Sequence, residues 1–180
     1  GAGNIMGAQQ HGHMESVGYD MYLKLLGEAV SEEKGEAAQS ADLDCLIDIS
    51  VNAHIPESYV ESLTLRLDVY RRIADIRNKE DSLDVKDELK DRFGEIPESV
   101  LGLIDIALIR NCANAMGIYE IRQTDTNVLL FVKEIKSPKV IELLSRLNGR
   151  AMLSAGNKPY ITIRCGGGSS LDMLKKVFKI

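Results

Sequence analysis

The chain has no tryptophan, and aromatic residues of any kind make up only 5% of its 180 residues. Proteins that hold single-stranded nucleic acid stack its bases on aromatic side chains, so this sequence offers little for such a surface. Its 22 basic residues are outnumbered by 27 acidic residues, which gives a net charge of −5. A negative surface repels a phosphate backbone, so nucleic acid is not the expected partner of the whole chain.

Signals for a membrane, for export and for disulfides are also missing. The sequence has no apolar run of about 18 residues, and its start lacks the charged and then apolar pattern of a secretory signal. We therefore expect no membrane contact and a cytoplasmic location. The three cysteines, Cys45, Cys112 and Cys165, lie far apart without a Cys-x-x-Cys pair. Such spacing fits reduced thiols that are mostly buried.

Residues that could carry catalysis or bind a metal are few. His11 and His13 lie in a glycine-rich segment without a cysteine or carboxylate at ligand spacing, so we predict no metal site. No Ser, His and Asp set and no Cys and His set is favoured locally, so we predict no catalytic residues. Residues 166–170, Gly-Gly-Gly-Ser-Ser, could hold a phosphate through backbone N–H groups. They lack the lysine of a P-loop, so a flexible connector is the simpler interpretation.

The composition changes between the first and the later parts of the chain. Apolar residues at helical spacing over residues 14–30 predict one amphipathic helix. Residues 31–42 are polar, charged and small, which is typical of a linker. We therefore predict a helical N-terminal arm over residues 1–30, a linker over 31–42 and a compact domain over 43–180.

The compact domain begins with an alternation of apolar and polar residues over 43–55, which predicts a strand that ends at Pro56. Pro56 is well placed to begin the first of three helices. The second helix is expected from about Ser82 to Phe93, and the third over residues 97–116, each followed by a glycine. The third helix is apolar nearly all round, so it should be the central, buried one.

After Gly117 the hydrophobic period shortens towards two, which indicates strands. Two hairpins are predicted, with a helix between them that Ser137 caps and a last helix that Ser169 or Ser170 caps. Their strands cover residues 118–123 with 128–133 and residues 151–154 with 160–165. The predicted fold class is α+β, with helices packed on a small, mostly antiparallel sheet.

One helix of this domain carries a stripe of acidic residues. Asp84, Asp87, Glu88 and Asp91 recur three and four positions apart, so they share one helical face. Their repulsion costs a few tenths of a kcal/mol per pair, which a basic partner would relieve and which Arg92 offsets in part. A solvated face is the simpler interpretation. As a docking face it would provide orientation and fast encounter more than affinity.

Several segments of the sequence resemble one family, the transcription-repair coupling factors. Residues 1–13 and 17–22 resemble the translocation motif that these factors share with RecG-like helicases, and the second segment favours the coupling factors. Residues 54–56, 66–74 and 87–94, followed by Pro97, resemble the last domain of the family in order and spacing. The resemblance covers most of residues 1–120 and is weak over the final 60 residues.

The resemblance implies a function for each part of the chain. In the translocation motif a glutamine links ATP hydrolysis to stepping along duplex DNA, and the spacing from Gly7 assigns this role to Gln10. The arginines of the motif belong before Gly1, so we expect the motif to be incomplete and inert. ATP and magnesium belong to the missing motor domains, and no cofactor is expected in this fragment.

For the compact domain the resemblance implies a lid. It would pack on a UvrB-like N-terminal module of the same parent protein and hide that module's UvrA-binding surface until the motor engages stalled RNA polymerase. The docking contacts transfer to Glu88, Asp91 and Arg92. The fragment itself would then be no enzyme. Two alternatives stay open: a DNA-binding accessory domain of a RecG-like helicase, and a small enzyme that binds a phosphorylated ligand.

Overall fold

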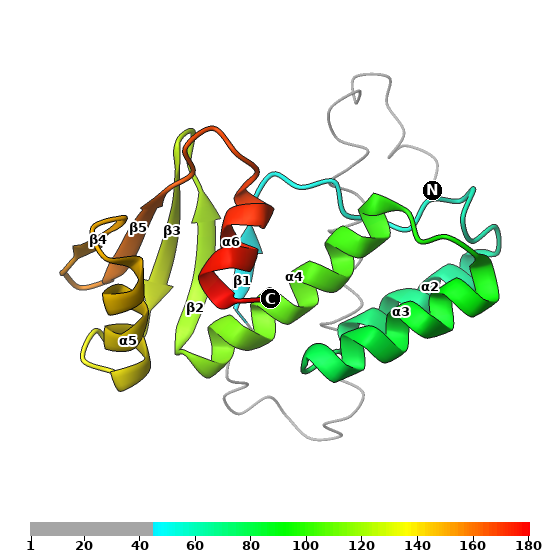
Figure 1. Ribbon diagram of the computed structural model, residues 1–180, viewed down its shortest axis with the longest axis horizontal. Coiled ribbons are helices and arrows are strands. Elements are labelled where there is room, and N and C mark those ends of the chain that lie inside the picture. Colours follow the sequence, from blue (N-terminus) through cyan, green and yellow to red (C-terminus); the bar gives the residue numbers. More distant parts are fainter. Residues whose placement is uncertain (1–44) are drawn as a thin grey trace, which may run out of the picture.

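The computed structural model describes residues 45–180, which form five helices on one five-stranded sheet. Figure 1 shows the sheet on the left and the α2–α3 pair on the right, with α4 running between them. This architecture confirms the predicted α+β class. The predicted N-terminal arm and linker, residues 1–42, lie outside the described residues.

The sheet has the spatial order β1-β2-β3-β5-β4. β1 pairs with β2 in parallel, and the other three neighbouring pairs are antiparallel, so the predicted mostly antiparallel sheet is confirmed. Both predicted hairpins form, β2 with β3 and β4 with β5. The strands are β1 (Leu46–Asp48), β2 (Ile118–Gln123), β3 (Asn127–Val132), β4 (Ala151–Ser154) and β5 (Tyr160–Arg164).

The first strand is much shorter than the predicted strand over 43–55. Only Leu46–Asp48 pairs with β2, yet alternate side chains remain buried further along, at Ala53 and Ile55. This later stretch lies over α4 (Glu98–Ala115), because the His54 N–H donates a hydrogen bond to the Ser99 carbonyl at 3.2 Å. Alternating apolar residues indicate only that every second side chain is buried. Packing against a helix buries them as well as pairing in a sheet does.

Two helices also begin at other residues than predicted. Pro56 opens a turn instead of a helix, since the Val60 N–H donates to its carbonyl at 3.1 Å, and α2 (Leu63–Ala74) follows a Ser62 cap. α3 (Lys79–Phe93) begins before Ser82 because Asn78 and Asp81 form a capping box. The Asn78 side chain accepts from the Asp81 N–H at 2.9 Å, and the Asp81 carboxylate accepts from the Asn78 N–H at 3.3 Å.

The core is built around α4, as predicted for a helix that is apolar nearly all round. Leu103, Ile104 and Ile109 are fully buried, and α4 contacts β1, β2, α2, α3 and α6 (Ser170–Phe178). α5 (Pro138–Leu147) adds Val140 and Leu143 to the same core. An ion pair joins α6 to α4, with 2.7 Å between Lys175 Nζ and Asp105 Oδ2.

The sheet face turned away from this core gathers three aromatic residues. Phe131 lies between Tyr119 and Tyr160, with ring centroids 6.1 and 5.4 Å apart, and the Arg122 guanidinium lies 5.2 Å from the Phe131 centroid. Phe131 is only 9% exposed. These rings are tilted against one another, by 47° and 46°, which is a common arrangement of aromatic pairs.

We expect the substitution Gly102→Ala in α4 to destabilise the domain. Replacing glycine by alanine inside a helix normally stabilises by about 1 kcal/mol. Here the added Cβ would lie 2.9 Å from the carbonyl oxygen of Asn52, in the segment that crosses α4. Overpacking of this kind typically costs about 1–3 kcal/mol, so the free energy of unfolding in urea should fall. Ser145→Ala, at an exposed position of α5, is the control and should change it little. Equal or higher stability of Gly102→Ala would contradict this packing.

Candidate docking surface

The acidic residues of α3 lie on the helix face opposite its packing face. Val85 and Leu89 are at most 1% exposed and turn towards the core, with Ser82 beside them. Asp84, Asp87 and Asp91 are exposed on the outer side, and Glu88 is half-buried. We call Asp84, Asp87, Glu88 and Asp91 the acidic face. Figure 1 shows α3 beside α2, at the end of the molecule away from the sheet.

Glu88 is held by two arginines. Its Oε2 accepts a hydrogen bond from Arg72 Nε of α2 at 3.1 Å, and its Oε1 accepts from Arg92 Nη1 at 2.8 Å. The Arg92 guanidinium also lies 4.9 Å from the centroid of the Phe93 ring. The structure thus brings two of the predicted docking residues, Glu88 and Arg92, into one fixed cluster with Arg72.

Arg72 was not identified as a site residue from the sequence. It stands 16 positions before Glu88 and on another helix, so no helical spacing connects the two. The only available signal was its place in residues 66–74, one of the segments that resemble the family.

The pKa of Glu88 is lowered from its ordinary value of 4.5, first of all by the hydrogen bond from Arg72. Partial burial acts in the opposite direction, and Arg92 adds a second favourable contact. Glu88 therefore stays ionised in acid further than a solvated glutamate does, and its charge is largely satisfied inside the domain.

The other carboxylates of the acidic face are free to bind a partner. Among residues 45–180 no cation lies within ion-pair distance of Asp87 or Asp91. Leu83, on the same exposed side of α3, is 53% exposed. A basic surface could therefore meet uncompensated carboxylates and one apolar side chain here. Of the predicted docking residues, Asp91 is the one that keeps an unshared carboxylate.

Gln10, the other residue to which the resemblance gives a role, lies outside the described residues, as do His11 and His13. Cys45 is buried, and Cys112 and Cys165 are half-buried. Within residues 45–180, no three His, Cys, Asp or Glu side chains form a group that could hold a metal ion. No helix in this part of the chain combines the length and hydrophobicity that crossing a bilayer requires.

The glycine-rich segment forms a defined turn between β5 and α6. Gly166 and Gly167 adopt the left-handed region, with φ of 58° and 81°, which only glycine enters freely. The Ser169 hydroxyl then caps α6 by accepting from the Asp172 N–H at 3.4 Å. Asp172 already places a negative charge in the first helical turn, which disfavours a bound phosphate at this position.

The structure thus describes a small α+β domain with a charged helix exposed at one end. The TRCF domain family matches residues 49–142. The chain is 34% identical over 183 residues to the transcription-repair-coupling factor of Bacillus subtilis (strain 168), covering 98% of this chain and 16% of the relative. It is 36% identical over 143 residues to that of Staphylococcus epidermidis (strain RP62A), covering 79% and 12%. The chain belongs to the transcription-repair coupling factor family.

A solved structure supports the same fold. The crystal structure of a C-terminal domain of transcription-repair coupling factor superposes with a TM-score of 0.66 at 18% identity. The match covers 75% of this chain and 88% of that one. The chain spans less than a fifth of the length of the relatives named above.

The contact between Arg72 and Glu88 predicts a pH-dependent contribution to stability. Because the pKa of Glu88 is lowered in the folded state, this contribution is complete above the ordinary value of 4.5 and disappears as the pH falls through the lower, folded value. We expect Glu88→Gln to lower the free energy of unfolding by a few tenths of a kcal/mol at neutral pH, because the pair is partly exposed. The difference from wild type, measured by urea denaturation, should vanish in acid. Glu142→Gln, at an exposed position of α5, should show no such difference. A difference independent of pH would contradict the role of the ionised pair.

Proposed function

We propose that this chain is a non-catalytic regulatory domain of a coupling factor that moves along duplex DNA with ATP, displaces stalled RNA polymerase and recruits nucleotide excision repair. In this proposal the domain docks on a UvrB-like N-terminal module of the same parent protein. The docked domain masks the surface of that module that binds UvrA. The family and the names of the relatives support the parent's role, and the acidic face of α3 supports docking.

The acidic face suits a reversible docking contact, which we call the latch: it is closed when the domain is docked on the module and open when the domain is released. Asp87 and Asp91 have no cation partner among residues 45–180, so arginines of a basic partner can bind them without breaking an internal pair. Arg92 is already oriented by Glu88 and by the Phe93 ring, which lowers the entropy lost when its remaining N–H groups bind. Leu83 adds apolar area at the edge of the charges.

The expected strength follows from these contacts. A few charge-assisted hydrogen bonds give a coupling of about 1–3 kcal/mol between the closed and the open state. Binding of polymerase and DNA elsewhere on the parent protein supplies enough free energy to overcome a latch of this size. Stronger closure would keep the UvrA-binding surface hidden, and weaker closure would leave it exposed.

The first residues of the chain have a separate role in the proposal. Gln10 belongs to the translocation motif, where its amide can donate and accept hydrogen bonds to a neighbouring motor lobe or a phosphate. ATP and magnesium bind in the motor domains of the parent, and the regulatory domain itself uses no cofactor.

Charge reversal on the acidic face tests the docking. We expect Asp87→Arg with Asp91→Arg to leave the fold intact, since both side chains are exposed, but to abolish binding to the isolated UvrB-like module of the parent protein. Glu88→Arg with Asp91→Arg should abolish binding too, and it additionally breaks the pair with Arg72. Affinities are measured by calorimetry at low salt, where surface charges are least screened.

The matched control is Asp125→Arg with Glu142→Arg, which changes the net charge equally at exposed positions away from α3. It should bind like wild type. Equal affinity of the wild type and the Asp87→Arg, Asp91→Arg variant would refute docking through the acidic face.

A further inference from the structure

A second charged surface, of opposite sign, lies at the other side of the domain. A cavity of about 1000 Å³ opens between the C-terminal end of α5, the end of β5 and α6. One acidic residue, Asp172, lines it. Its basic lining residues are Arg146, Arg150, Lys176 and Lys179, together with Arg164, whose side chain points to the other side of β5. We call this cavity the basic groove. The surplus of positive charge is notable because the whole chain carries −5.

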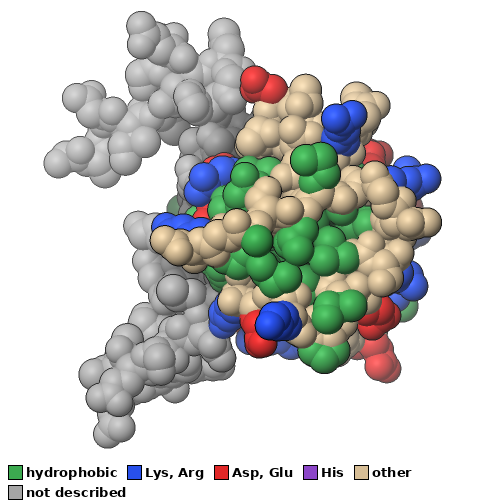
Figure 2. All heavy atoms as spheres, turned by 90° about the vertical axis from the view of Figure 1, so that its left-hand side faces the viewer, with side chains coloured by type: hydrophobic (Ala, Val, Ile, Leu, Met, Phe, Trp, Pro, Cys, Tyr) green, Lys and Arg blue, Asp and Glu red, His purple; other side chains and the backbone are tan. Residues whose placement is uncertain are grey.

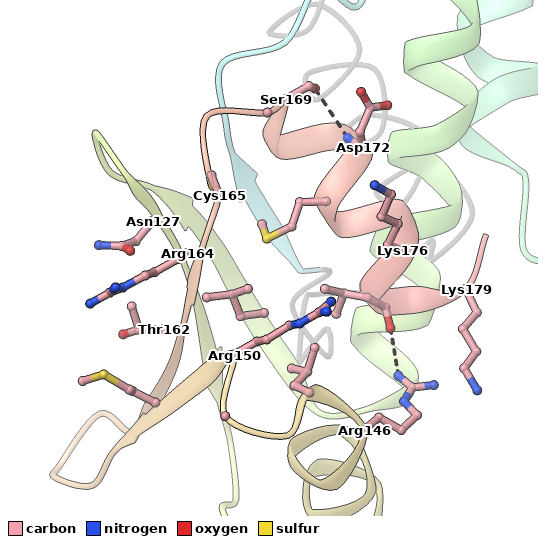
Figure 3. Close-up of a pocket in the computed structure, with 17 residues that line it drawn as sticks. Asn127, Arg146, Arg150, Thr162, Arg164, Cys165, Ser169, Asp172, Lys176 and Lys179 are labelled. Carbon is pink, nitrogen blue, oxygen red and sulfur yellow. Dashed lines mark hydrogen bonds between the residues drawn. The ribbon is translucent and has the colours of Figure 1, made fainter.

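The groove is built from parts of the chain that the fold brings together. Asn148 and Gly149 have φ of 26° and 79°, and this turn at the end of α5 directs Arg150 to the groove. Arg146 is fixed from the other side, because its Nη2 donates to the Val177 carbonyl of α6 at 2.8 Å. In Figure 3 the Arg150 side chain extends towards α6, whereas Arg164 points to the opposite side of β5 with Asn127.

The floor of the groove is apolar. Leu147, Ile163, Met173 and Val177 contribute to its lining. Met152, which is 66% exposed, pairs with Thr162 and lies on the other face of the sheet. Figure 2 shows hydrophobic side chains gathered at the centre of the side that is on the left in Figure 1, with both basic and acidic side chains around them. β4 and α5, which lie on this side, also expose Leu153 and Ile141. A ligand that fits this groove must therefore offer negative charge and apolar groups together.

The combination of a cationic rim and an apolar floor distinguishes a nucleic-acid ligand from a protein ligand. A nucleic acid offers phosphates, but no aromatic residue lines the groove to stack its bases. A protein segment that mixes Asp or Glu with aliphatic residues matches both the cationic rim and the apolar floor. The arginines of the rim can bind carboxylates in bidentate form.

We propose that the basic groove is a docking site for an acidic protein segment that carries apolar side chains. The site is separate from the acidic face, because Figure 1 shows α3 on the right and α5 and β5, which contribute to the groove, on the left. The domain can then hold a basic partner at α3 and an acidic partner at the groove at the same time.

The test uses the whole chain and a short labelled peptide in which glutamates alternate with leucine and valine. In fluorescence anisotropy this peptide should bind, and binding should weaken as salt is added. The matched peptide with glutamines in place of glutamates should bind at least about tenfold more weakly, because the cations of the rim lose their partners. Equal binding of the two peptides would overturn the proposal.

Variants of the chain locate the binding. Arg150→Glu with Lys176→Glu should weaken binding by about tenfold or more. Lys136→Glu with Lys158→Glu makes the same charge change at exposed positions outside the groove lining and should have little effect. If both double variants lost affinity for the peptide equally, the effect would come from the overall charge of the chain, and the proposed site would be wrong.

Two further measurements exclude other occupants. A short DNA duplex should not compete with the peptide; competition that depends on Arg150 and Lys176 would make the groove a nucleic-acid site instead. The acidic face of a second copy could also fill the groove. In sedimentation the chain should stay monomeric. Self-association that is lost in the Asp87→Arg, Asp91→Arg variant would show that the groove binds a second copy instead of the proposed partner.

Discussion

The burial of most of α4 is the constraint on which the rest of the domain depends. A helix without a continuous polar face cannot lie open to water, so other elements have to cover most of it. The sheet covers one side, α2 and α3 another, and α6 and the segment after β1 cover further parts of it. At Gly102 this segment lies so close that no side chain fits between it and the helix.

The charged surfaces follow from this arrangement. α3 uses its apolar side against the core, and its outer side is left to carry carboxylates. α6 likewise packs Leu174 and Val177 against the core and carries lysines on its outer side. The helices that enclose α4 are thus also the elements that carry charge to the surface. Because they lie on different sides of α4, the acidic face and the basic groove are kept apart, and the opposite charges do not neutralise one another.

The proposed latch depends on how the charges of the acidic face are shared. Glu88 is satisfied inside the domain by Arg72 and Arg92, so it stabilises the α2–α3 pair more than it invites a partner. Asp87 and Asp91 carry the negative charge that a partner can still use. This division lets the domain stay folded whether the latch is closed or open, as a regulatory element must.

The sequence by itself determined the α+β class, the central helix and both hairpins, because these depend on local hydrophobic period and on turn residues. It also indicated the acidic stripe, since residues three and four positions apart share a helical face whatever surrounds the helix. It misplaced the starts of α2 and α3 and the length of β1, where a turn at Pro56, the Asn78 capping box and packing on α4 decided the outcome. The partner of Glu88 and the basic groove were decided only by tertiary structure. Their residues come from separate elements, and no local pattern relates Arg72 to Glu88 or Arg150 to Lys176.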